Sequence, residues 1–229
     1  MTNEPATGGN ARETTGRIAG TVNADGAVLA AAAAVFFIGS AVLTRSGNPG
    51  ASTPVPWMAS HFLWFVATGL AAVGVLALYR RREAFSAGIA GPVAAGAFGL
   101  AVLDALQWMA WVYVDIFARQ GGAHESLHGP LLHPFGTGHA LMYGVLVGLG
   151  VASLAWAVDR SRPTHRLLTY GGLGVGTATA VVAAVALVTV ADVREPASLA
   201  TVVLLAASWG WLLVAGVALG RDGAVRTAE

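Results

Sequence analysis

Six apolar runs, each close to 20 residues long, constrain this chain more than any other feature of its sequence. They cover residues of about 27–44, 57–79, 88–114, 138–158, 167–191 and 198–219. About 20 consecutive apolar residues are what an α-helix needs to cross the hydrocarbon core of a bilayer. Only 11% of the residues are charged, against about 25% in an average soluble domain. The sequence therefore predicts an all-α integral membrane protein with six transmembrane helices.

The arginines predict how these helices are oriented. Of the 13 basic residues, all of them arginine, ten fall on the side shared by both termini, and three fall on the other: Arg45, Arg119 and Arg194. Because basic residues in short loops accumulate on the cytoplasmic side, both termini are predicted to be cytoplasmic. We expect a disordered N-terminus over residues 1–25, the bundle over 26–220 with an outer loop of about 115–137, and a cytoplasmic tail over 221–229.

The composition excludes several classes of protein. A formal net charge of +1 leaves no broad basic face for nucleic acid. The chain has no cysteine, which excludes disulfides, thiolate-ligated iron–sulfur clusters and thiol catalysis. It also lacks the lysine that a retinal Schiff base requires. We interpret the missing lysine, together with abundant Ala, Gly and Val, as a GC-rich coding bias, which predicts a prokaryotic protein of the cell membrane.

Two of the predicted helices begin with matching segments. Residues 56–65 (PWMASHFLWF) align without gaps to residues 134–143 (PFGTGHALMY), 78 positions further on, and place His61 opposite His139. The match is typical of a duplicated helical hairpin in parallel orientation. The alternative is that proline and an aromatic residue commonly begin transmembrane helices. A duplication would set the two histidines at equal depth, facing each other across an axis along the membrane normal.

Two histidines at equal depth on different helices are suited to ligate a haem iron from both sides. Trp64 and Trp108 would supply flat apolar walls, and Arg45 would pair with a haem propionate. An interfacial aromatic belt is the alternative explanation of the tryptophans. We therefore expect His61 and His139 to bind haem b near the outer face, in electron transfer or sensing, with a quinone or an external redox partner.

Methionines and loop histidines allow a different metal. Met58 with His61, and His139 with Met142, are i,i+3 pairs, so each pair shares a helix face. Thioether and imidazole ligands suit Cu(I), although methionine is also an ordinary filler of apolar gaps. The outer loop adds three further imidazoles: His124, His128 and His133. Copper or zinc is therefore the alternative to haem.

Residues 124–128 read HESLH and resemble the H-E-x-x-H motif of zincin proteases. The resemblance implies that His124 and His128 hold zinc and that Glu125 polarises water. It covers five residues, and the flanking Gly and Pro residues leave barely one turn of helix. An outer-face metal-dependent hydrolase is therefore one alternative function. The other interpretation is that the loop histidines are freely solvated and form no site.

Asp104 is the only carboxylate deep within a predicted span, and Gln107 lies on its helix face. An ionisable group at that depth costs at least about 2.5 kcal/mol, so it usually faces the interior of a bundle. We expect Asp104 to relay protons, to orient a ligand histidine, or to bond a neighbouring helix. It supports the remaining alternative functions: a transporter, or an accessory or assembly subunit of a larger membrane complex.

Glycines spaced four residues apart predict where helices pack closely. Gly144 and Gly148 form one such pair, and Gly172 and Gly176 form another. Small residues at this spacing let two helix backbones approach each other in a membrane.

Overall fold

The computed structural model describes residues 24–45, 55–80, 88–127, 133–161, 163–189 and 191–226. Its helices are α1 (Ala24–Arg45), α2 (Val55–Arg80), α3 (Ala90–Gln120), α4 (His124–Leu127), α5 (His133–Ala157), α6 (Pro163–Val188) and α7 (Ala191–Arg226). Six of these, all but the short α4, are long and apolar enough to cross a membrane. No β-strand occurs in the described ranges. The prediction of an all-α protein with six membrane-spanning helices is confirmed.

The third long helix runs further than its apolar run. Helix α3 continues to Gln120, so residues 115–120 are helical instead of belonging to the predicted outer loop. Polar contacts hold this extension, because Arg119 Nε donates to Asp115 Oδ2 at 3.0 Å, one turn apart. The helix ends at two glycines, of which Gly122 adopts a φ of +73° that favours a residue without Cβ.

The rest of the predicted outer loop is also partly helical. Helix α4 interrupts it, and α5 begins at His133 instead of near residue 138. At the other end of the chain α7 continues to Arg226, where we expected a tail from residue 221. Hydropathy marks where an apolar run ends, whereas backbone hydrogen bonding continues through polar residues. Residues 1–23 and 227–229 of the predicted termini lie outside the described residues.

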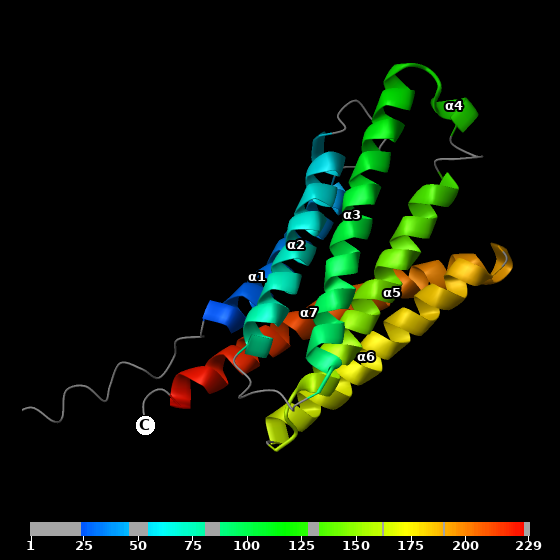
Figure 1. Cartoon of the computed structure of the whole chain (residues 1–229). Helices are drawn as coiled ribbons and strands as arrows, with labels where there is room; N and C mark the ends of the chain where they lie inside the picture. Colours follow the sequence, from blue (N-terminus) through cyan, green and yellow to red (C-terminus); the bar gives the residue numbers. More distant parts are fainter. Residues whose placement is uncertain are drawn as a thin grey trace, which may run out of the picture.

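The six long helices form a closed ring. In order around it they are α1, α2, α3, α5, α6 and α7, with α7 packed back onto α1 and α5 also touching α7. Helices α6 and α7 are inclined to α2 and α3 (Figure 1). Trp209 of α7 is fully buried inside the ring and stacks on Phe36 of α1, with ring centroids 4.6 Å apart.

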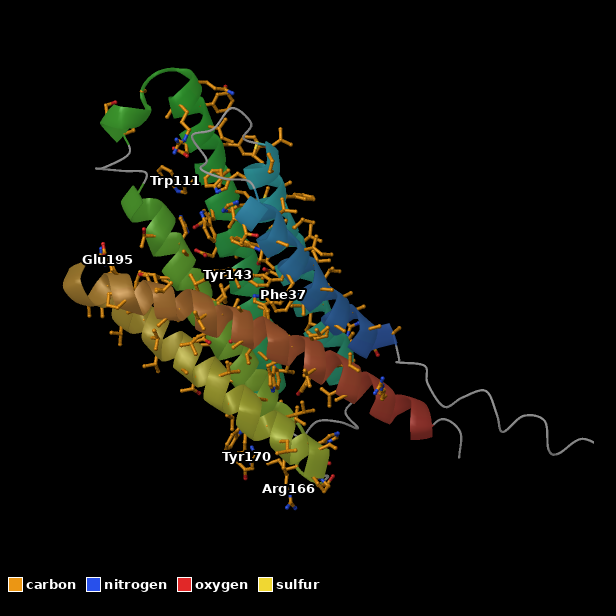
Figure 2. All side chains as sticks on the ribbon, turned by 180° about the vertical axis from the view of Figure 1, so that it is seen from behind. Phe37, Trp111, Tyr143, Arg166, Tyr170 and Glu195 are labelled. Carbon is orange, nitrogen blue, oxygen red and sulfur yellow. The ribbon has the colours of Figure 1, made fainter. Side chains whose placement is uncertain are left out.

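The end of the bundle that carries α4 is called here the α4 end. Figure 2 shows Trp111 towards this end and Arg166 at the opposite end. The distribution of arginines predicts that the α4 end faces outward. The orientation itself stays a prediction.

Helices α5 and α6 pack backbone to backbone through two of the predicted glycines. A Cβ placed on Gly176 would lie 2.6 Å from the Ala152 nitrogen and 2.7 Å from the Gly148 oxygen. Neither distance leaves room for a methyl group, so only glycine permits this approach. The prediction that Gly148 and Gly176 serve close helix packing is confirmed.

The two segments that match in sequence begin equivalent helices. Val55, the first residue of α2, and His133, the first of α5, are 78 positions apart, which is the offset of the match. His61 and His139 are therefore each the seventh residue of their helix. The duplication itself stays a prediction.

Candidate functional site

A carboxylate–histidine pair joins α3 to α5. His139 Nδ1 lies 2.9 Å from Asp104 Oδ1, and both side chains are largely buried. With the carboxylate ionised, the Nδ1–H group donates this bond, and Nε2 of the neutral ring carries the lone pair. The structure shows that Asp104 bonds a neighbouring helix, and the bonded residue is the predicted ligand His139, so the orienting and proton-relay roles stay predictions.

The second oxygen of this carboxylate is one of four buried side-chain polar atoms in the described part of the chain that make no hydrogen bond. Asp104 Oδ2 is buried and has no hydrogen-bond partner among the described residues. Leaving a buried acceptor unsatisfied costs about 1–3 kcal/mol. Oδ2 can therefore still take up a proton or accept a hydrogen bond from a donor group. Gln107, which we expected on the same face, is exposed on α3.

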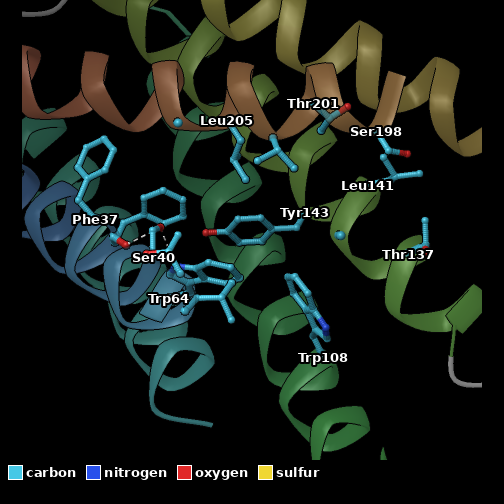
Figure 3. A pocket seen from close by; sticks show the side chains of 16 residues that line it. Phe37, Ser40, Trp64, Trp108, Thr137, Leu141, Tyr143, Ser198, Thr201 and Leu205 are labelled. Atoms are coloured by element: carbon cyan, nitrogen blue, oxygen red, sulfur yellow. Dashed lines mark hydrogen bonds between the residues drawn. The ribbon is translucent and has the colours of Figure 1, made fainter. Parts of the chain in front are cut away.

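A cavity of about 500 Å³ lies between α1, α2, α3, α5 and α7. Figure 3 shows Tyr143 reaching from α5 towards Trp64 and Ser40, with Trp108 below. The walls are aromatic and aliphatic, with several hydroxyl groups: Phe36, Phe37, Ser40, Leu43, Thr44, Trp64, Trp108, Thr137, Ala140, Leu141, Tyr143, Ser198, Thr201, Val202, Leu205 and Ala206.

Helical spacing places the pair near this cavity, although neither Asp104 nor His139 lines it. Trp108, which lines it, is one turn beyond Asp104 on α3, and Tyr143 is one turn beyond His139 on α5. Residues four apart share a helix face. Asp104 also interacts electrostatically with the Tyr143 hydroxyl. The pair is thus one helical turn from two residues that line the cavity.

Tyr143 is held by a buried hydrogen bond across the bundle. Thr68 Oγ1 donates to the Trp64 carbonyl at 2.7 Å, so the Tyr143 hydroxyl, also at 2.7 Å, donates to Thr68 Oγ1. Tyr143 is only 2% exposed.

Tyr143→Phe is therefore expected to lower the free energy of unfolding by about 1 kcal/mol, because one buried hydrogen bond is lost. Denaturant unfolding of the purified protein measures the change. Tyr170→Phe is the matched control, since Tyr170 is 67% exposed on α6. An equal effect of both substitutions would contradict a structural role for the Thr68–Tyr143 bond.

His61 lies in a different environment, surrounded by indole rings. Its ring centroid is 4.7 Å from that of Trp57, 5.1 Å from Trp64 and 4.9 Å from Trp108. Nδ1 lies 2.8 Å from the Trp57 carbonyl oxygen. Because a carbonyl only accepts, Nδ1–H donates and Nε2 is left with the lone pair. His61 is thus buried and oriented, as a ligand histidine requires.

The structure brings both predicted ligand histidines to α3 and gives each its own partner there. His61 contacts Trp108, and His139 bonds Asp104 one turn away. Trp64 and Trp108 contact His61 and also line the 500 Å³ cavity, whereas His61 lines a separate cavity of about 300 Å³. No group of three or more His, Asp or Glu side chains in the described part of the chain is placed to hold a metal ion.

Several predicted site residues lie outside this description. The side chains of Arg45, His124, Glu125, His128 and His133 are not among those the structure describes. The haem, copper and zinc assignments and the hydrolase motif therefore stay predictions.

Two features of the site were missed in the sequence. Thr68 and Tyr143 are polar residues inside apolar spans, and this pattern could have indicated that they form a buried hydrogen bond. Met109 belongs with Met58 and His61 around the 300 Å³ cavity. The sequence indicated the position of Met109 only through the general rule that consecutive antiparallel helices usually pack together.

No family model matches this chain, and neither a curated protein nor a solved structure shows significant similarity to it. The fold defines a multi-pass membrane protein whose helices suit a lipid bilayer.

Proposed function

We propose that this protein is a proton-coupled transporter that binds a small lipophilic cation in the 500 Å³ cavity and exchanges it for a proton on the Asp104–His139 pair. The observation that carries this proposal is a buried carboxylate–histidine pair one helical turn from Trp108 and Tyr143, which line a largely apolar cavity. Ionisable residues inside membrane helices commonly mark proton relays and substrate pathways.

The charge of the pair supports an exchange. A carboxylate beside a neutral imidazole carries one negative charge, and uptake of one proton makes the pair neutral. In a low-dielectric surrounding, a nearby cation or a proton compensates that charge, and binding both at once leaves an excess positive charge. Cation and proton therefore compete for the same site.

The residues that line the cavity support a lipophilic cation as the class of substrate. The faces of Trp64, Trp108 and Tyr143 supply aromatic surface, which attracts cations. The remaining lining consists of Phe36, Phe37, aliphatic residues and residues with hydroxyl groups, and it contributes no charge. A molecule with an apolar body and one diffuse positive charge matches both features. A proton gradient across a prokaryotic cell membrane would drive the exchange.

Tetraphenylphosphonium is a suitable probe of this proposal. Titrated into purified protein in a weakly buffered detergent solution, it is expected to quench tryptophan fluorescence saturably and to release up to about one proton per cation bound. Raising the pH removes the competing proton, so the affinity is expected to rise by up to about tenfold per pH unit. An affinity that is independent of pH, without proton release, would contradict the exchange.

A redox role is the second candidate, and a separate observation favours it. Both His61 and His139 have Nδ1 engaged in a hydrogen bond and so present Nε2, which is typical of histidines that bind metals. Purified protein with bound haem b would show a Soret band and a sharp α band after dithionite reduction. Loss of these bands in His61→Ala or His139→Ala would support the redox role over transport.

A further inference from the structure

The 300 Å³ cavity brings together three side chains that the transport proposal does not use. It lies between α2 and α3, and Met58, His61 and Met109 are the lining residues whose side chains carry sulfur or nitrogen. The other lining residues are Val55, Ala59, Phe62, Val112 and Tyr113, so no carboxylate reaches it. Two thioethers and one imidazole are the sulfur and nitrogen ligands available there, and the Tyr113 hydroxyl is the other polar side-chain group of the lining.

This donor set selects for a soft cation. Thioether sulfur binds Cu(I) well and binds hard divalent ions poorly, and imidazole is a good copper ligand. A site without a carboxylate does not offset a double positive charge, which favours a monovalent ion. His61 is already positioned by its Nδ1 bond to the Trp57 carbonyl, which leaves Nε2 as the ligand atom.

Aromatic rings next to the cavity favour the same ion. Phe62 and Tyr113 line the cavity, and the rings of Trp57 and Trp108 contact His61 from outside it. Aromatic faces attract a desolvated cation. A positive charge that no anionic ligand compensates would gain from these rings.

We propose that Met58, His61 and Met109 form a binding site for Cu(I), which Ag(I) also fits. The ligand set differs from the one predicted in the sequence, which combined Met58 and His61 with His139 and Met142. Met142 is 40% exposed on α5 and does not line this cavity, and His139 is bonded to Asp104. Packing of α2 against α3 selects Met109 in their place.

The test is anaerobic competition for Cu(I) against bicinchoninate, with the full chain in detergent. Replacing His124, His128 and His133 by glutamine first removes the loop imidazoles as competing ligands. This protein is expected to retain about one Cu(I) per chain. Met58→Leu and Met109→Leu are each expected to weaken binding at least about tenfold, since leucine preserves the volume and removes the sulfur.

Met142→Leu is the matched control and is expected to bind Cu(I) as tightly as its parent. The site is overturned if Met58→Leu/Met109→Leu binds Cu(I) as tightly as its parent. Equal weakening by Met142→Leu also overturns it, and so does loss of all binding when the loop histidines are replaced. Should a leucine variant unfold, X-ray absorption of the Cu(I)-loaded parent decides: a sulfur shell supports the site, and a shell of nitrogen and oxygen alone rejects it.

Discussion

Replacing Asp104 with asparagine is expected to abolish proton-driven accumulation of ethidium, a fluorescent aromatic cation, in proteoliposomes. Asparagine has nearly the same shape, and its amide oxygen still accepts the bond from His139 Nδ1, which is 2.9 Å away in the wild type. It carries no charge and takes up no proton. The variant therefore keeps the helix contact and loses both the attraction for the cation and the exchange.

The size of this effect follows from electrostatics. A single charge acting over several ångströms in a medium of effective dielectric constant near 20 contributes a few kcal/mol. Each 1.4 kcal/mol is a factor of ten in affinity. We therefore expect Asp104→Asn to weaken tetraphenylphosphonium binding at least about tenfold and to remove its pH dependence.

Asp115→Asn is the matched control for both measurements. Asp115 is also a buried carboxylate of α3, but it lies eleven residues beyond Asp104 and pairs with Arg119 at the α4 end. Asp115→Asn should transport ethidium as well as the wild type does. For both proteins, the accumulation in liposomes without protein is subtracted as background. If Asp104→Asn still accumulates ethidium in response to a proton gradient, Asp104 is not the coupling residue.

Gly176→Ala is expected to lower the free energy of unfolding by about 1–3 kcal/mol, the range for overpacking a tight contact. The added methyl would meet the backbone of α5 at Ala152 and Gly148, and backbone atoms do not move aside as a flexible side chain does. Helices α5 and α6 would have to separate. Reversible unfolding of the purified protein by denaturant measures the loss.

Gly174→Ala is the control on the same helix, because a Cβ there would meet nothing within 4 Å. Alanine is up to about 1 kcal/mol more favourable than glycine in a helix, so this variant should be as stable as the wild type or slightly more stable. Gly148→Ala should act like Gly176→Ala, and the two effects should not add, because both methyls strain the same contact. Equal stability of Gly174→Ala and Gly176→Ala would contradict this packing.

The candidate site was only partly predictable. Asp104 was singled out in the sequence because ionisable groups are rare within apolar spans, and His139 because its segment matches that of His61. Their pairing was not, since the two residues are 35 positions apart and belong to helices whose packing no local pattern specifies. The same limit explains why Met142 was predicted as a ligand and Met109 was not. An i,i+3 spacing relates residues within one helix, whereas the cavity is formed by residues of two helices.

The sequence by itself determined the class of protein and the positions of its six spans. Burying uninterrupted apolar runs of this length in a bilayer is favourable for each helix separately, so no tertiary contact is needed to recognise them. Gly148 and Gly176 were likewise recognised from their spacing alone. Only the tertiary structure decided which helices are neighbours, and with them the Asp104–His139 bond, the indole surroundings of His61 and both cavities. Those features depend on the rotation and crossing of helices, which are set by side-chain packing between residues distant in the chain.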